Sequence, residues 1–291
     1  MRVKHILTLF FTKMGIQLFR WVPFFCLYLL ADLLFFLLKD IIKYRKKVIK
    51  ANLSSSFPEK NAAEIDAIAN LSYRNLCDIT IESIKGLTLA KSSIQKRYKI
   101  LNPEILDVHF NEGKSIILAG AHYCNWEWGV RSWSLWFKHQ VMGIYKPLSN
   151  KTVEGYMNAR REDLGMKLVG PKETRASLAL ANNTPCIFVL FGDQSPHNTS
   201  TCHWVNFLHH DTPWLQGVGE IAFQNDFPVY YLETTRVRRG YYESTLITIV
   251  QSPLDYSPQQ ISALYAHQVE ENIRLKPEDW LWSHKRWKHQ R

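Results

Sequence analysis

Short apolar runs alternate along the chain with longer segments in which apolar residues recur at helical spacing. The apolar runs have strand length and cover residues 98–103, 115–119, 140–145, 185–191, 228–232 and 245–250. Helical spacing is found at residues 62–86, 151–164 and 259–275. Strands that alternate with helices are typical of α/β proteins. We therefore predict an α/β fold in which a mixed sheet is flanked by helices.

The helical patterns differ in quality. Gly165 follows the segment 151–164, and a glycine at this place is a common helix end. Between residues 62 and 86 the helical register is imperfect, which predicts either one bent helix or two short ones.

The first fifty residues contain the most apolar part of the chain. Residues 21–38 are apolar except for Asp32, and this run approaches the roughly 20 residues that cross a bilayer. Pro23 and Asp32 weaken a span, because a carboxylate at the membrane centre costs about 2.5–3.5 kcal/mol. We expect a membrane-anchoring helix that either docks in one leaflet or crosses as a short tilted span. A buried core helix is the alternative, and a cleaved signal peptide is disfavoured by the long basic tract that follows.

A cluster of basic residues follows the apolar run. It consists of Lys43, Arg45, Lys46, Lys47 and Lys50. Each such residue near an anionic membrane contributes about 1 kcal/mol of binding. We predict that residues 1–50 form the membrane anchor with its basic juxtamembrane segment, and that residues 51–291 form the functional domain.

The whole chain is basic, with 36 Lys and Arg against 26 Asp and Glu and a formal net charge of +10. Such a charge suits nucleic acid, an anionic membrane or an acidic protein partner. No nucleic-acid recognition module is visible, so we expect no nucleic-acid partner. The five cysteines include no Cys-x-x-Cys pair, which indicates neither a disulfide framework nor a zinc site. His209 and His210 are adjacent but have no evident third ligand, so we expect no metal.

Candidate chemistry follows the apolar run 115–119, where His122 and Glu127 stand five positions apart. An imidazole can take a proton from a hydroxyl when a carboxylate orients its ring and stabilises its charged form. We expect the pair to straddle a turn and the first turn of a helix, with His122 as general base and Glu127 as its partner. The alternatives are a hydrogen-bonded core histidine and a nucleophilic Cys124.

The motif His-x-x-x-x-Glu, with Asn125, Trp126 and Glu127 inside it, resembles the late acyltransferases of lipid A biosynthesis. These belong to the wider lysophospholipid acyltransferase superfamily, whose signature is His-x-x-x-x-Asp/Glu. Further segments match this family in order, so the resemblance covers most of the chain. They are residues 51–59, 145–148, 158–165, 191–194, 205–217 and 277–288.

The resemblance implies catalytic roles for His122 and Glu127. It also implies an arginine shortly before Gly165 in substrate binding; Arg161 is the better match and Arg160 the alternative. A guanidinium suits a phosphate, although a solvated helix face is the simpler use of these residues. An aspartate at the end of a strand could orient the arginine or a substrate hydroxyl, or it could cap the next turn. The implied substrate-binding residues are Asn125, Tyr145, Lys146, Arg161 and Asp193.

The resemblance further implies a glycerol-3-phosphate acyltransferase-like sandwich and a membrane-bound enzyme of the bacterial inner membrane, with its active site facing the cytoplasm. It would move a fatty acyl chain from acyl carrier protein, or from acyl-CoA, to a hydroxyl of a lipid A precursor in lipopolysaccharide biosynthesis, without a cofactor. Alternative acceptors are a lysophospholipid, a glycolipid or an aminolipid, and a transferred amino acid is a further alternative. A non-catalytic membrane-surface protein is the alternative from another class.

Overall fold

The computed structural model describes residues 2–145, 147, 150–170, 172–181, 183–289 and 291. Its α-helices are α1 (Arg2–Trp21), α2 (Phe24–Phe36), α3 (Lys46–Ser56), α4 (Ala62–Gly86), α5 (Lys91–Arg97), α6 (Asp107–Asn111), α7 (Trp126–Ser132), α8 (Lys151–Glu162), α9 (Thr174–Leu180), α10 (Gly217–Asn225) and α11 (Pro258–Leu275). Its strands are β1 (Tyr98–Ile100), β2 (Ile116–Gly120), β3 (Gln140–Ile144), β4 (Lys167–Val169), β5 (Cys186–Phe191), β6 (Cys202–Phe207), β7 (His210–Leu215), β8 (Val229–Arg238) and β9 (Tyr241–Val250).

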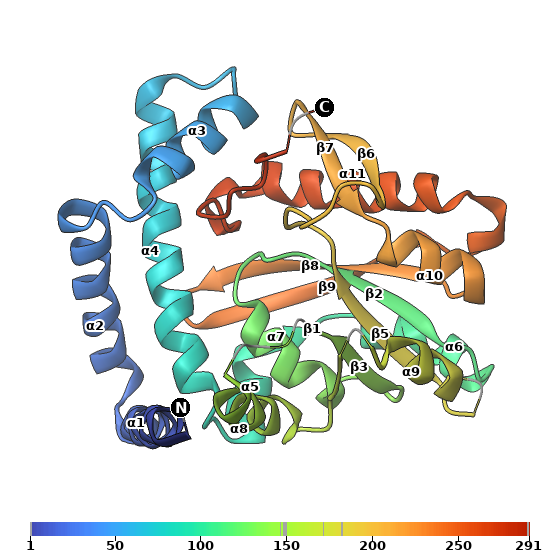
Figure 1. The fold of residues 1–291 in the computed structure, drawn as a ribbon, viewed down its shortest axis with the longest axis horizontal. Coiled ribbons are helices and arrows are strands. Elements are labelled where there is room, and N and C mark those ends of the chain that lie inside the picture. Colours follow the sequence, from blue (N-terminus) through green and yellow to red (C-terminus); the bar gives the residue numbers. More distant parts are fainter. Residues whose placement is uncertain (1, 146, 148–149, 171, 182, 290) are drawn as a thin grey trace.

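A mixed sheet forms the centre of the described part of the chain, with strand order β1-β9-β8-β2-β5-β3-β4. Strands β8, β2, β5, β3 and β4 run parallel, while β1 and β9 run in the opposite direction. Figure 1 shows α10 and α11 on one side of this sheet and α5, α7 and α8 on the other. The predicted α/β fold, a mixed sheet flanked by helices, is therefore confirmed.

The predicted strands all form, and the last two are longer than their apolar runs. The apolar run at 228–232 is the buried half of β8, which continues to Arg238 and returns as β9 in an antiparallel hairpin. Beyond Thr234 the residues of β8 are exposed or half-buried, and all but Val237 are polar, so the apolar pattern could not reveal that the strand continues.

The segment 62–86, with its imperfect register, forms a single helix, α4. Asn61 accepts hydrogen bonds from the backbone N–H groups of Ala63 and Glu64, and the Glu64 side chain accepts from the Asn61 backbone N–H. This reciprocal capping box satisfies otherwise unpaired donors at the start of the helix. The helix packs against α2, α3 and α7 in turn, which explains why its apolar residues follow no single stripe.

The sequence pattern did not predict the second sheet, the hairpin of β6 and β7. The turn consists of Leu208 and His209, which have positive φ angles of 50° and 67°. Two-residue hairpin turns of this kind usually contain Asn-Gly or Asp-Gly, so the Leu-His pair carries no turn signal.

The apolar run at 21–38 is divided between two helices. α1 ends at Trp21, and α2 begins at Phe24 after Pro23, which has no backbone N–H group to donate to the preceding helix. Among the residues that the structure describes, no helix is both long enough and apolar enough to cross a membrane.

Helix α4 holds the N-terminal helices against the rest of the chain (Figure 1). The Lys85 ammonium group donates to the carbonyl oxygens of Phe19, Arg20 and Val22, where α1 ends. On α2, the Asp32 carboxylate lies 2.8 Å from the Arg239 guanidinium in the loop between β8 and β9. The only carboxylate of the apolar run is therefore paired with an arginine of the protein.

Candidate active site

His122 and Asp193 meet at the carboxyl edge of the sheet because of the register of two parallel strands. β2 and β5 pair so that Gly120 lies opposite Phe191, and each candidate residue stands two positions beyond this pair. The His122 ring nitrogen Nδ1 lies 2.7 Å from the Asp193 Oδ1 atom, and the His122 backbone N–H donates to Oδ2 at 2.8 Å. This edge of an open α/β sheet is where such proteins usually form their sites.

The C-terminal segment completes the surroundings of Asp193. The Trp280 indole N–H donates to the Asp193 Oδ2 atom at 3.0 Å, and the Leu281 backbone N–H donates to the His122 carbonyl at 3.2 Å. Tyr123 and Trp280 form an antiparallel bridge, so the segment pairs with the loop that carries the histidine. The family-matching segment 277–288 therefore supports Asp193 and the loop that carries His122.

Asp193 is fully buried and has an unusually low pKa. Burial alone would raise its pKa, but the adjacent His122 and the hydrogen bonds from His122 and Trp280 hold it below its usual range. The carboxylate is therefore ionised at neutral pH and accepts the proton of Nδ1, which leaves Nε2 as the basic nitrogen of His122. The aromatic rings of Trp126 and Phe191 pack edge-on against the imidazole and fix its plane.

Glu127 does not have the partner that the sequence analysis expected. Its carboxylate pairs with Arg161 on α8, through contacts from Nη2 at 2.9 and 3.0 Å and from Nε at 3.2 Å. The difference arises because Glu127 is the second residue of α7, where the helix directs its side chain toward α8. Asp193 takes the role of ring partner although it is 71 positions from His122.

The structure also distinguishes the two candidate arginines. Arg161 lines the cavity beside Glu127, whereas the Arg160 guanidinium lies over the ring of Tyr156, 5.5 Å from its centroid. Of the pair, Arg161 is therefore the one that the fold directs to the site.

A cavity of about 460 Å³ opens beside these residues, within the usual size range of ligand pockets. His122, Glu127, Tyr145 and Arg161 contribute polar groups to its wall. Its apolar lining includes Val130, Ile144, Met166, Leu168, Val189 and Phe191. A wall that combines polar groups with aliphatic side chains suits an amphipathic substrate.

Two other residues expected to bind substrate have different positions. Asn125 is fully buried and does not line the cavity; its amide caps α7 by accepting from the Trp128 backbone N–H and donates to Glu82. The Asn125 side chain therefore does not face the cavity, and its role in substrate binding stays a prediction. Tyr145 lines the cavity, and its hydroxyl donates to Glu154 at 3.2 Å. Lys146 lies outside the described residues.

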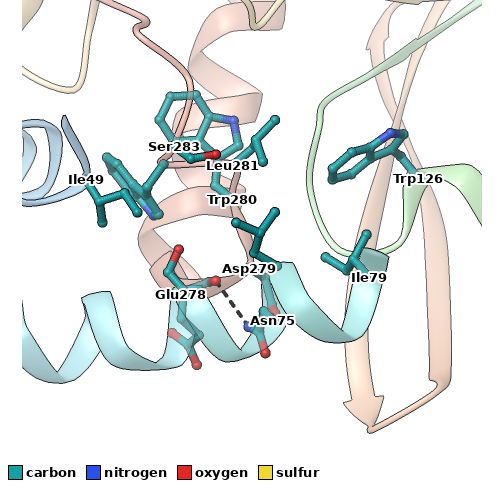
Figure 2. A pocket seen from close by; sticks show the side chains of 12 residues that line it. Ile49, Asn75, Ile79, Trp126, Glu278, Asp279, Trp280, Leu281 and Ser283 are labelled. Carbon is teal, nitrogen blue, oxygen red and sulfur yellow. Dashed lines mark hydrogen bonds between the residues drawn. The ribbon is translucent and has the colours of Figure 1, made fainter. Parts of the chain in front are cut away.

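A second, much smaller crevice lies between α4 and the C-terminal segment (Figure 2). Its volume is about 10 Å³, which is close to the space of one water molecule. Figure 2 shows Asn75 of α4 bonded to Asp279, with Trp126 on the far side. This crevice is too small for a substrate, so we assign the site to the larger cavity.

Cys124, the alternative nucleophile, and His284, which lies near the site, both have structural surroundings. The Cys124 thiol is fully buried, and burial raises its pKa well above the usual value, which disfavours a nucleophilic thiolate. The His284 Nε2 atom accepts a hydrogen bond from the Ser195 backbone N–H, and burial lowers the pKa of His284 to about 4. Within the described ranges, no group of three or more His, Cys, Asp or Glu side chains gathers as a metal site.

Comparison with known proteins agrees with this geometry. The family described as bacterial lipid A biosynthesis acyltransferase matches residues 1–289. This chain belongs to that family. It is accordingly an acyltransferase of lipid A biosynthesis. A lipid A biosynthesis palmitoleoyltransferase of Escherichia coli (strain K12) is 21% identical over 282 residues, which cover 93% of this chain and 88% of the relative. A lipid A biosynthesis acyltransferase of Shigella flexneri shows the same identity and coverage.

Sequence reasoning on the acyltransferase missed two contacts of the site. It considered Asp193 as a turn cap or as a group that orients the arginine or a substrate hydroxyl. It considered the Trp-rich terminus that contains Trp280 only as an interfacial or carrier-binding surface. Equal spacing from the ends of two apolar runs was the available signal, since His122 and Asp193 each follow a buried strand at the same distance. That signal becomes useful only when β2 and β5 are known to be neighbours.

Proposed function

We propose that this enzyme transfers a fatty acyl chain from the thioester of acyl carrier protein to a hydroxyl group of a lipid A precursor. The observation that carries the proposal is the His122–Asp193 pair beside a cavity with an apolar wall, in a chain of the lipid A acyltransferase family. The hydrogen bond to Asp193 orients the imidazole, and the cavity provides room for an acyl chain.

In the proposed reaction, Nε2 of His122 accepts the proton of the acceptor hydroxyl while that oxygen attacks the thioester carbonyl carbon. Asp193 stabilises the imidazolium that forms. The tetrahedral intermediate then collapses, the carbon–sulfur bond breaks, and the sulfur takes the proton from His122. The products are an ester and a free thiol, and no acyl-enzyme is required because the thioester is already activated.

Glu127 and Arg161 have a different part in this proposal. Their contacts fix the Arg161 guanidinium at the cavity wall, 21% exposed, rather than leaving it free in solvent. A guanidinium is suited to a phosphate or a developing oxyanion, because it presents several donors in one plane. We assign to Arg161 the binding of an anionic group of the substrate, and to Glu127 the orientation of Arg161.

The aliphatic part of the cavity is the proposed site of the acyl chain. It lies between β3, β4 and β5 on one side and α7 on the other, where Ile144, Leu168, Val189 and Val130 line the wall. Each methylene removed from water in such a place contributes about 0.8 kcal/mol of binding.

The choice of acyl carrier protein as donor rests on charge. Acyl carrier protein is acidic, and the formal net charge of +10 on this chain favours association with it. Acyl-CoA is the alternative donor.

The proposal includes docking of the N-terminal helices on the cytoplasmic face of the bacterial inner membrane. Trp21 and Phe25 are 79% and 72% exposed, and they belong to a larger set of exposed apolar residues. The others on this part of the chain are Leu7, Phe10, Phe11, Met14, Leu18, Leu29, Leu30, Leu33, Phe36, Ile41 and Ile42. Exposed apolar patches of this kind, flanked by basic residues such as Lys46 and Lys47, are typical of membrane-binding surfaces.

The test is an assay of acyl transfer by the full chain in detergent or vesicles. Acyl carrier protein loaded with chains of several lengths, or acyl-CoA, is offered with a lipid A precursor or a lysophospholipid. Mass spectrometry then detects the added acyl mass. We expect acylation of the lipid A precursor that is lost in His122→Ala. His267→Ala, an exposed histidine on α11, is the matched control and should retain activity.

The outcomes separate the parts of the proposal. Acylation of the lysophospholipid alone would reject the acceptor and keep the chemistry. Transfer from acyl-CoA alone would reject the donor. Full activity of folded His122→Ala would reject His122 as the base.

A further inference from the structure

Glu82 on α4 is a buried carboxylate that no part of the proposed mechanism uses. It is fully buried, and three donors surround it: the hydroxyls of Tyr28 at 2.9 Å and Tyr242 at 2.7 Å, and the side-chain amide of Asn125 at 2.8 Å. Among the described residues Glu82 forms no ion pair, because the nearby Arg236 pairs with Asp78 instead. A buried carboxylate is costly unless hydrogen bonds stabilise it, so this arrangement requires its donors.

The contacts of Asn125 show what Glu82 controls. The Asn125 Oδ1 atom accepts from the Trp128 backbone N–H at 3.0 Å and thereby caps the start of α7. The amide NH₂ group must then face Glu82, where it needs an acceptor. Oε2 of Glu82 is that acceptor at 2.8 Å, so Glu82 holds the amide in this orientation. Glu82 also binds α7 through its backbone, because its carbonyl accepts from the Trp128 indole N–H at 2.7 Å.

The turn held in this way is one that the local sequence does not favour. Cys124, immediately before the cap, has a positive φ angle of 51°, which is unfavourable for a residue other than glycine. Helix α7 has seven residues and is too short to be stable alone. The start of α7 therefore depends on the cap. Because Glu127 is the second residue of the helix, the cap also fixes the place of Glu127.

We propose that Glu82 is a positioning residue for acyl transfer: its carboxylate fixes the Asn125 amide, which caps α7 and directs Glu127 to Arg161. This inference rests on the proposed function and adds to it a residue of α4 that does not line the cavity. Because Tyr28 belongs to α2, the same carboxylate also joins the N-terminal helix to the site.

A reciprocal exchange of the amide and the carboxylate tests the proposal. Asn125→Asp retains an acceptor for the Trp128 N–H but places two carboxylates face to face. We expect kcat to fall by about 100-fold, the usual effect of a displacement of about 1 Å at a site. In Glu82→Gln/Asn125→Asp the glutamine amide donates to the new aspartate, and kcat should return to within about tenfold of the wild type.

Tyr242→Phe is the matched control, because it removes a hydrogen bond from the same carboxylate without contacting Asn125. We expect it to lower the temperature of unfolding and to retain kcat. A merely structural role of Glu82 predicts instead that kcat of the folded variants follows their stability, with no recovery in the double variant.

The outcomes are distinct from those of the proposed function. If the wild type and His122→Ala are equally inactive, the proposed function fails. If the wild type is active and folded Asn125→Asp retains its kcat, or the double variant is no better than Asn125→Asp, the role of Glu82 is rejected. If Asn125→Asp does not fold, Glu82→Gln decides: a reduced kcat supports the role, and an unchanged kcat overturns it.

Discussion

Replacing Asp193 by asparagine would test the proposed chemistry with almost no change of shape. In the wild type, Oδ2 accepts from the His122 backbone N–H and from the Trp280 indole, while Oδ1 accepts from Nδ1 of His122. In Asp193→Asn, the single carbonyl oxygen is held by the two donors on the Oδ2 side. The amide NH₂ group then faces His122 and donates to Nδ1. The imidazole proton moves to Nε2, which can no longer accept the proton of the substrate hydroxyl.

The expected magnitude follows from this change of tautomer. The corresponding Asp→Asn change in a serine protease triad lowers kcat by about 10⁴-fold. Trp280 and His122 hold the amide in the unfavourable orientation here, so we expect a loss of about 10³–10⁴-fold in kcat. This loss corresponds to about 4–5.5 kcal/mol of activation free energy, at 1.36 kcal/mol for each factor of ten. Because the replacement has the same shape, the protein should remain folded.

The assay measures initial rates of acyl transfer by mass spectrometry, with circular dichroism to verify the fold. Asp226→Asn is the matched control, since Asp226 forms a partly exposed pair with Lys114 away from the cavity. Retention of more than about a tenth of the wild-type kcat by folded Asp193→Asn would refute the role given to this carboxylate. A complete loss in Glu127→Gln alongside such retention would instead favour Glu127 as the group that acts on the proton.

The acid stability of the wild type gives an independent check on Asp193. Its pKa is lowered in the folded protein, because His122 and the hydrogen bonds outweigh the effect of burial. The stabilisation is therefore present above the ordinary aspartate pKa of about 3.9 and is lost as pH falls through the lower, folded pKa. We expect the loss of unfolding free energy at acid pH to be smaller in Asp193→Asn.

Three further predictions concern the cavity, the C-terminal segment and the N-terminal helices. A Cβ atom on Gly143 would lie 3.2 Å from Leu168 in the cavity wall. Gly143→Ala should therefore shift the preferred acyl donor toward shorter chains, by about fourfold in kcat/KM for each methylene excluded. An unchanged preference for chain length would exclude this wall as the acyl site. Burial lowers the pKa of His284 to about 4, so the unfolded chain binds a proton first as pH falls below about 6.5, and the wild type should lose stability between pH 6.5 and 4. His284→Gln should lose less stability over this range in thermal unfolding. The same dependence of unfolding temperature on pH in both proteins would contradict the assignment. Phe25→Glu should weaken binding to anionic vesicles in flotation assays while leaving the fold intact, and unchanged flotation would argue against docking through α2.

Much of the fold was predictable because buried strands and amphipathic helices leave periodic patterns. The parallel strands β2, β3, β5 and β8, the helix before Gly165 and the C-terminal helix appear where the patterns place them, whereas the three-residue strand β4 left no recognisable pattern. The β6–β7 hairpin was not predictable, since Leu208 and His209 adopt a turn that their residue types do not indicate. The apolar run at 21–38 likewise did not reveal that Pro23 separates two helices that dock on α4.

The sequence by itself determined the α/β class. It also identified His122, Glu127, Arg161 and Asp193 as candidate residues of the site. Only the tertiary structure decided how they pair. The register of β2 and β5 brings His122 to Asp193, and the direction of α7 turns Glu127 to Arg161. Local periodicity depends on neighbours along the chain, whereas these contacts join residues 34 and 71 positions apart and follow from strand order and helix packing.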